Sequence, residues 1–141
     1  MTVAIIQART TSRRFPNKVM IKINNQPMIN YVYKRVKKSK KIKKIIITCS
    51  NLKSDDQIAA FCKKKKYNLF RGPLRNVLNR YSKTLKKYNL SYFVRINGDS
   101  PCIDSKLIDQ AVILFKKKKY YKIKKINPKS NPVGVSIEII K

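Results

Sequence analysis

Short apolar runs alternate along this chain with segments whose apolar residues have helical spacing. Four runs suit buried strands and are too short for helices: residues 3–6, 45–48, 67–70 and 92–96. The segments with helical spacing lie at residues 28–36, 54–62, 74–85 and 104–115. An alternating run predicts a last strand at Val133–Ile139. This order predicts an α/β fold, a doubly wound, mostly parallel sheet with helices on both faces. We expect a single domain over residues 1–141.

The residues that follow the predicted strands are small, polar or charged. They are Gln7-Ala8-Arg9, Cys49-Ser50-Asn51, Arg71-Gly72 and Asn97-Gly98-Asp99. Ligands of open α/β sheets bind at the carboxyl ends of the strands, so we expect the functional site at this edge. The sequence contains neither a GxGxxG motif nor a Walker loop, which argues against a dinucleotide site and against a P-loop.

The loop after the first strand is dense in hydrogen-bond donors. Its cations and hydroxyls are Arg9, Thr10, Thr11, Ser12, Arg13, Arg14 and Lys18. Pro16 prevents the segment from being the interior of a helix. Guanidinium, ammonium and backbone N–H groups favour oxyanions, so the loop suits a polyphosphate. The alternative is a solvated basic loop in a chain that is basic throughout.

Only six acidic residues occur, so their positions are informative. We expect Asp55 and Asp56, in a capping box, and Asp104 to cap helices, and Asp109 to be a surface charge. Asp99 differs because it ends a buried strand opposite the basic loop. Mg²⁺ takes one or two carboxylates together with substrate phosphates, so Asp99 suits a magnesium site. The alternative is an aspartate that forms a turn with its own backbone.

The charge balance is extreme, with 35 Lys and Arg against 6 Asp and Glu and a formal net charge of +29. Such a charge raises nucleic-acid binding as an alternative function, supported by interleaved tyrosines at 67, 81, 88, 120 and 121. The excess is mostly lysine, in runs such as 63–66 and 116–119 at the ends of predicted helices. We therefore favour compositional drift on solvated surfaces, with non-specific nucleic-acid binding at low salt.

Cellular context follows from what the sequence lacks. No apolar run has the length of a membrane span and the N-terminus lacks the features of a signal peptide, so we expect a cytoplasmic protein without membrane contact. Cys49, Cys62 and Cys102 form an odd, widely spaced set, and the chain has no histidine. We expect reduced cysteines and no zinc site.

Four segments resemble the sugar-acid cytidylyltransferases, which include the 3-deoxy-manno-octulosonate and acylneuraminate enzymes and the related spore-coat polysaccharide proteins. The first is ARxxSxRxPxK, carried by Ala8, Arg9, Ser12, Arg14, Pro16 and Lys18. The others are FRGPLRNVLNRY at 70–81, RINGDSPCID at 95–104 and PVGVSIE at 132–138. Thr11 and Asn17 replace family glycines, and Asn76 replaces an aspartate. Family members also continue beyond the point where this chain stops, and a second metal-binding aspartate lies in that part.

The resemblance implies a Rossmann-like fold of the nucleotide-diphospho-sugar transferase kind. It implies transfer of CMP from CTP to a sugar acid in surface polysaccharide or glycan biosynthesis, with Mg²⁺ as cofactor and a homodimer as assembly. The implied catalytic residues are Arg9, Lys18 and Asp99, with Asp99 on the metal and Glu138 facing the sugar. The implied nucleotide-binding residues are Gln7, Ala8, Arg9, Ser12, Arg14, Lys18, Arg71, Gly72, Asn97 and Gly98. Alternatives are a nucleotide-binding protein without turnover, and a uridylyl- or guanylyltransferase, whose usual G-x-G-x-R loop is absent.

Overall fold

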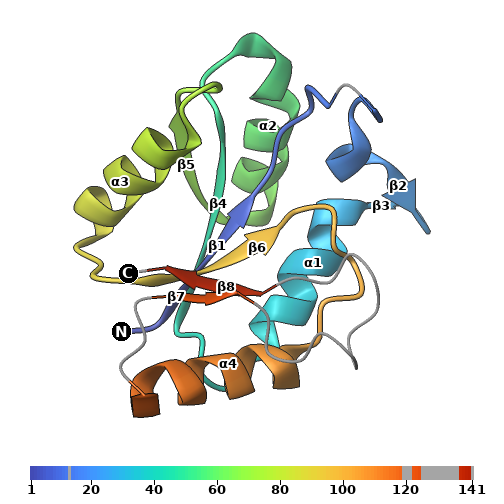
Figure 1. Cartoon of the computed structure of the whole chain (residues 1–141). Helices are drawn as coiled ribbons and strands as arrows, with labels where there is room; N and C mark the ends of the chain where they lie inside the picture. The colour runs from blue at the N-terminus through green and yellow to red at the C-terminus, as the bar shows by residue number, and fades with distance from the viewer. Residues whose placement is uncertain (13, 119–121, 125–136, 141) are drawn as a thin grey trace.

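The computed structural model describes residues 1–12, 14–118, 122–124 and 137–140 (Figure 1). The larger sheet contains β1 (Val3–Gln7), β4 (Lys44–Ser50), β5 (Asn68–Gly72), β6 (Phe93–Asn97), β7 (Lys122–Lys124) and β8 (Glu138–Ile140). A small sheet contains β2 (Lys22–Ile23) and β3 (Gln26–Pro27). The helices are α1 (Met28–Lys37), α2 (Asp56–Lys65), α3 (Val77–Tyr88) and α4 (Ser105–Lys118), with short 3-10 turns η1 (Lys18–Met20) and η2 (Lys53–Asp55).

The strand order in the larger sheet is β5-β4-β1-β6-β8-β7. β1 lies between β4 and β6 and is parallel to both, and β5 is parallel to β4. β8 is antiparallel to β6 and to β7. The predicted α/β fold with a mostly parallel sheet is therefore confirmed, and the antiparallel edge is an addition that the sequence did not indicate.

The sheet carries a core on each face, because successive side chains of a strand point to opposite sides. Ala4 and Ile6 of β1 pack in the larger core, with buried residues of α1, α2 and α4. Ile5 packs in the smaller core with Tyr81 of α3 and Phe93 of β6. Three helices therefore cover one face and α3 covers the other, as Figure 1 shows for α3 and α1.

Two predictions about acidic residues are wrong. Asp55 is the residue before α2, but no side-chain hydrogen bond caps that helix. Asp109 is more than a surface charge: its carboxylate accepts hydrogen bonds from the Ser39 hydroxyl at 2.5 Å and from the Lys40 and Lys41 backbone N–H groups at 3.0 Å each. Asp109 thus fastens the connection between α1 and β4 to α4, whereas Asp104 caps α4 as predicted, through the Lys106 N–H at 2.8 Å.

Some boundaries differ from the sequence-based expectations. α3 begins at Val77 rather than near Leu74, because the Asn76 side chain accepts a hydrogen bond from the Asn79 N–H at 2.9 Å and caps the helix there. The expected turn at Asn24 and Asn25 is present, and it joins β2 to β3 in a hairpin that was not predicted. Residues 133–136 of the expected last strand lie outside the described residues.

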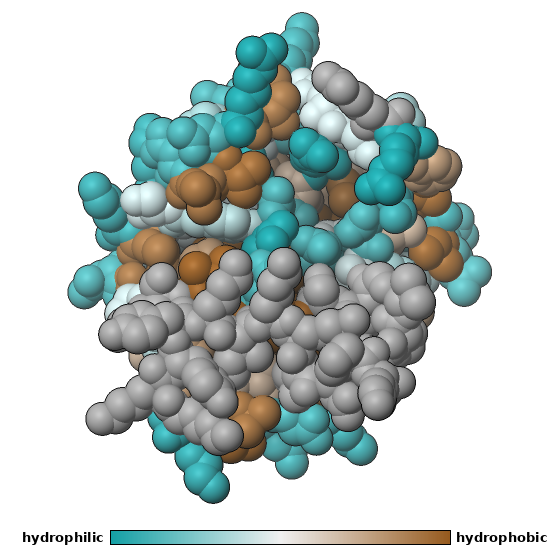
Figure 2. Space-filling view, viewed as in Figure 1, coloured by the Kyte–Doolittle hydropathy of each residue, from teal (hydrophilic) through white to brown (hydrophobic). Residues whose placement is uncertain are grey.

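Hydrophilic side chains project from much of the visible surface (Figure 2). Lysines occupy the last turns of α1, α2 and α3, where the helix dipole favours cations. No described helix has the length and apolar character needed to cross a membrane. All three cysteines are free; Cys49 and Cys62 are buried, and burial raises their pKa values to about 11 and about 12.

Candidate nucleotide site

The carboxyl ends of β1 and β6 are joined by a close backbone contact. The Gly98 N–H donates to the Gln7 carbonyl oxygen at 2.8 Å, and a Cβ at position 98 would lie 2.8 Å from that same oxygen. Glycine is therefore needed for the two strand ends to approach. On the other side of β1, the Ala8 N–H donates to the Thr48 carbonyl oxygen at 2.9 Å. The ends of three strands thus form one edge, from which the basic loop departs.

A first cavity of about 370 Å³ lies between the basic loop and the end of β6. It is lined by Gln7, Arg9, Ser12, Arg14, Lys18, Val19, Arg95, Asn97 and Asp99. The Lys18 Nζ lies 3.2 Å from the Asp99 Oδ2, and each side chain is 41% exposed. The structure thus brings together seven of the predicted site residues, which come from the loop and from the ends of β1 and β6.

The donor set of this cavity suits a polyphosphate together with a cation. Arg9, Arg14, Lys18 and Arg95 supply positive charge for oxyanions. Asp99 supplies one accessible carboxylate, and the described residues contain no cluster of three or more acidic or cysteine side chains. A metal held by protein ligands alone would need more carboxylates than this cavity offers. The arrangement instead fits Mg²⁺ held by one carboxylate together with substrate phosphates and water.

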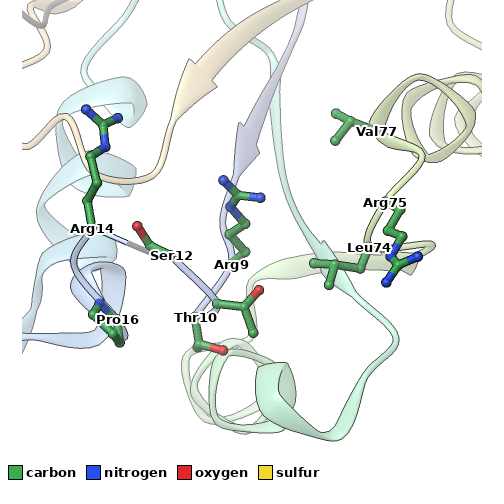
Figure 3. Close-up of a pocket in the computed structure, with 9 residues that line it drawn as sticks. Arg9, Thr10, Ser12, Arg14, Pro16, Leu74, Arg75 and Val77 are labelled. Carbon is green, nitrogen blue, oxygen red and sulfur yellow. The ribbon is translucent and has the colours of Figure 1, made fainter.

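A second cavity of about 760 Å³ shares Arg9, Ser12 and Arg14 with the first. Figure 3 shows its two sides: the basic loop faces the segment at the start of α3. The remaining lining residues are Thr10, Thr11 and Pro16 from the loop and Leu74, Arg75 and Val77 from the facing wall. The facing wall is apolar at Leu74 and Val77 and cationic at Arg75, and the loop supplies donors, so the cavity can accommodate a molecule with a planar apolar part and an anionic part.

A hydrogen-bonded network lies behind the first cavity. The Arg95 Nη1 donates to the Glu138 Oε2 at 2.7 Å, and its Nε lies 3.1 Å from the Tyr81 hydroxyl and 3.3 Å from the Gln7 Oε1. Tyr81 also donates to Gln7. Burial raises the pKa of Tyr81, which keeps its hydroxyl protonated and able to donate. The Glu138 side chain is 12% exposed and its carboxylate pairs with Arg95, and its predicted contact with a sugar stays a prediction.

The basic loop is fastened to the end of β4 by a carboxylate that the sequence analysis assigned to helix capping. The Asp55 Oδ1 accepts from both the N–H and the hydroxyl of Thr10, at 2.8 Å each, and its Oδ2 accepts from the Ser50 N–H at 2.8 Å. Asp55 is fully buried. Burial acts to raise the pKa of Asp55, but the hydrogen bonds from Ser50 and Thr10 prevail and hold it below its ordinary value.

Four predicted nucleotide-binding residues, Ala8, Arg71, Gly72 and Gly98, line neither cavity. The Arg71 guanidinium donates to the Ser50 carbonyl at 2.9 Å and to the Leu52 carbonyl at 2.8 Å, and it pairs with the Asp56 carboxylate at 2.7 Å. Gly72 is buried against the Arg80 side chain, and Ala8 is 2% exposed. Their roles stay predictions, as does the contribution of Gly98 through its backbone. Arg13 lies outside the described residues.

Sequence reasoning placed neither Arg95 nor Tyr81 at the site, and it gave Thr10 only a general role as one donor of the basic loop. Arg95 and Tyr81 lie within two of the segments that resemble the cytidylyltransferases, so the resemblance could have indicated that both residues lie near the site. No local pattern indicated the contact between Thr10 and Asp55, because the two residues are 45 positions apart.

Solved structures of nucleotidyltransferases share this α/β fold with its mostly parallel sheet. A cytidylyltransferase from Leptospira borgpetersenii has a similar structure, with a TM-score of 0.89, 30% identity, and coverage of 98% of this chain and 59% of that chain. A CMP-2-keto-3-deoxy-manno-octonic acid synthetase, solved in complex with CTP, has a TM-score of 0.74. At 14% identity, with 99% of this chain and 73% of that chain covered, it shows the fold alone.

Sequence comparison identifies the family. The family model described as cytidylyltransferase matches residues 3–135, so the chain belongs to the cytidylyltransferase family. The spore coat polysaccharide biosynthesis protein SpsF of Bacillus subtilis is 33% identical over 109 residues, which cover 74% of this chain and 45% of that protein. The chain spans about half the length of the curated relatives it matches, with 55%, 45% and 48% for three of them.

Proposed function

We propose that this protein transfers CMP from CTP to a sugar acid and releases pyrophosphate, in the synthesis of a surface polysaccharide or glycan. The observation that carries the proposal is the first cavity, where Arg9 and Arg14 line the same space as the Lys18–Asp99 ion pair at the carboxyl edge of the sheet. Membership of the cytidylyltransferase family supports CTP as the nucleotide, and one relative of the same fold was solved with CTP. The names of the relatives support a sugar acid and a polysaccharide.

In this proposal the protein acts by positioning and by neutralising charge. A hydroxyl of the sugar acid attacks the α-phosphorus of CTP, the bond from the α-phosphorus to the β-phosphate oxygen breaks, and pyrophosphate leaves. Arg9, Ser12, Arg14 and Lys18 hold the phosphates and stabilise the charge of the leaving group. Asp99 would hold Mg²⁺, which when bound would neutralise the phosphates.

The decisive experiment measures CTP binding with and without Mg²⁺ for the wild type and for Asp99→Asn. We expect the substitution to abolish the Mg²⁺-dependent part of binding and to leave the purely cationic part, which added salt then screens. Because Lys18 and Asp99 are both 41% exposed, losing their ion pair should change the free energy of unfolding by less than about 1 kcal/mol. Asp104→Asn is a matched control, since asparagine also caps helices well.

Two results would contradict this proposal. If Mg²⁺ strengthens CTP binding by the same factor in Asp99→Asn as in the wild type, Asp99 is a turn residue. An equal response to CTP, ATP and inorganic polyphosphate would show that charge alone drives binding. Measuring pyrophosphate release with CTP and a panel of sugar acids would then identify the acceptor and test turnover.

The nucleic-acid alternative loses part of its support in the structure. Tyr67 stacks on Tyr33 with ring centroids 3.5 Å apart, and Tyr81 is buried in the smaller core. These rings are therefore engaged within the protein rather than exposed for stacking on bases. Tyr120 and Tyr121 lie outside the described residues. Binding of DNA that persists at physiological salt and is not displaced by CTP would revive this function.

A further inference from the structure

We propose that Asp55 is a positioning residue that sets the shape of the phosphate-binding loop through Thr10. The inference rests on the proposed function, because it concerns the same site. Asp55 lies 45 positions from Thr10 in the sequence and lines neither of the two cavities, yet both of its carboxylate oxygens accept hydrogen bonds from residues that define the carboxyl edge of the sheet.

Thr10 is the point from which the loop is held. Its N–H lies 2.8 Å from the Asp55 Oδ1, and its hydroxyl lies 2.8 Å from that same oxygen and 2.9 Å from the Ser54 carbonyl oxygen. Its carbonyl oxygen accepts from the Ser12 N–H at 3.0 Å and from the Asn17 N–H at 2.8 Å. Thr10 thus fixes both the first turn of the loop, at Ser12, and the end of the loop, at Asn17. Lys18 is the next residue after Asn17. The distance between the loop and the end of β4 is therefore set by the Asp55 carboxylate.

The position of Thr10 determines which side chains reach the substrate cavities. Arg9 precedes it, and Ser12 follows within the turn that the Thr10 carbonyl closes. Both side chains line both cavities, whereas Asp55 lies beneath them, fully buried. Release of Thr10 would free these donors to adopt several arrangements, and ordering them again would cost affinity for a polyphosphate.

The Asp109 carboxylate offers a control for Asp55, because it accepts similar hydrogen bonds and lies away from the site. Asp109 accepts hydrogen bonds from one hydroxyl and two backbone N–H groups, the same combination that Asp55 accepts. It fastens the connection that precedes β4, at the opposite edge of the sheet. Loss of Asp109 should therefore reduce stability through the same kind of interaction without moving the loop.

The experiment compares Thr10→Val, Thr10→Ser and Asp55→Asn with Asp109→Asn. For each variant, binding of Mg·CTP and of inorganic tripolyphosphate is measured by calorimetry, and the free energy of unfolding by urea titration. We expect Thr10→Val and Asp55→Asn to raise Kd for both ligands about tenfold or more, which corresponds to about 1.4 kcal/mol. Thr10→Ser retains the hydroxyl, so its Kd values should stay within about twofold of those of the wild type. The Kd values of Asp109→Asn should do the same, although this variant should be less stable.

The results separate this inference from the proposed function. Unchanged tripolyphosphate affinity in Thr10→Val, alongside reduced stability, would overturn the inference and show that Asp55 is purely structural. If Asp55→Asn does not fold, the pair of Thr10 variants still decides. Tripolyphosphate binding that depends on Thr10, in a protein that does not prefer CTP, would support the inference while contradicting the proposed function. A wild type that binds neither ligand would refute both.

Discussion

Substituting Gly98 by alanine should separate the ends of β1 and β6. The added Cβ would lie 2.8 Å from the Gln7 carbonyl oxygen and 3.3 Å from the Ala8 Cβ. Favourable contacts between carbon and oxygen begin at about 3.3 Å, so the two strand ends must move apart by about half an ångström. The contacting oxygen belongs to the backbone of the central strand, so no side-chain rotation can relieve the contact.

The cost of Gly98→Ala follows from opposing terms. Overpacking of this kind costs about 1–3 kcal/mol. Alanine also restricts the unfolded chain, which returns about 0.4–1 kcal/mol. We therefore expect the free energy of unfolding to fall by about 1–2 kcal/mol, and Tm to fall by roughly 3–8 °C for a chain of this size. Asp99 is the next residue in the chain, so its distance from Lys18 should also change. Mg²⁺ should then strengthen CTP binding less than it does in the wild type.

Urea unfolding and CTP titration of Gly98→Ala test both expectations. Ile108→Val is the control, because this fully buried residue of α4 lies away from both cavities and the change costs about 0.5–1.5 kcal/mol. The control should lose similar stability and keep its CTP affinity. A Gly98→Ala protein with wild-type stability and wild-type affinity would refute the argument that the strand ends need a glycine at this contact.

Two further predictions concern buried carboxylates. Glu138→Gln should lower the free energy of unfolding, measured by urea titration, by about 1–3 kcal/mol, because the Arg95 guanidinium loses its charged partner. Unchanged stability would instead indicate that Glu138 serves only to contact a sugar. The lowered pKa of Asp55 means that the unfolded chain binds the proton more readily than the folded chain. The resulting stability is present above the pKa of the unfolded state and is lost as pH falls through the folded pKa, so it should decline below about pH 5. Urea titrations between about pH 3 and pH 7 should show a shallower decline for Asp55→Asn, and an identical slope would contradict this assignment.

The larger part of the fold could be predicted because its signals are local. The apolar runs at β1 and β4 and the helical spacing of α1 and α4 lie within single segments, and a regular alternation of such segments admits few topologies. The β2–β3 hairpin was missed because each of its strands has two residues, which leaves no periodicity to detect.

The candidate site could be predicted where a residue's role follows from its place at a strand end. Asp99 is of this kind, and the structure brings it to 3.2 Å from Lys18 of the basic loop. Asp55 was assigned from its neighbours in the sequence and Arg71 from the family resemblance, whereas their side chains bind groups that the fold brings from other segments. Short polar side chains have several partners within reach, and only the folded backbone selects among them.

The central position of β1 has a consequence for how the protein folds. One neighbour, β4, begins at residue 44, and the other, β6, begins at residue 93. Pairing of β1 with β6 closes a longer loop of chain than pairing of β1 with β4, so we expect it to form later in folding. We likewise expect the cavity between the basic loop and β6 to form late. Interactions absent from the transition state affect unfolding rather than folding. An anion bound at this edge would thus lengthen the lifetime of the folded protein and leave its folding rate almost unchanged.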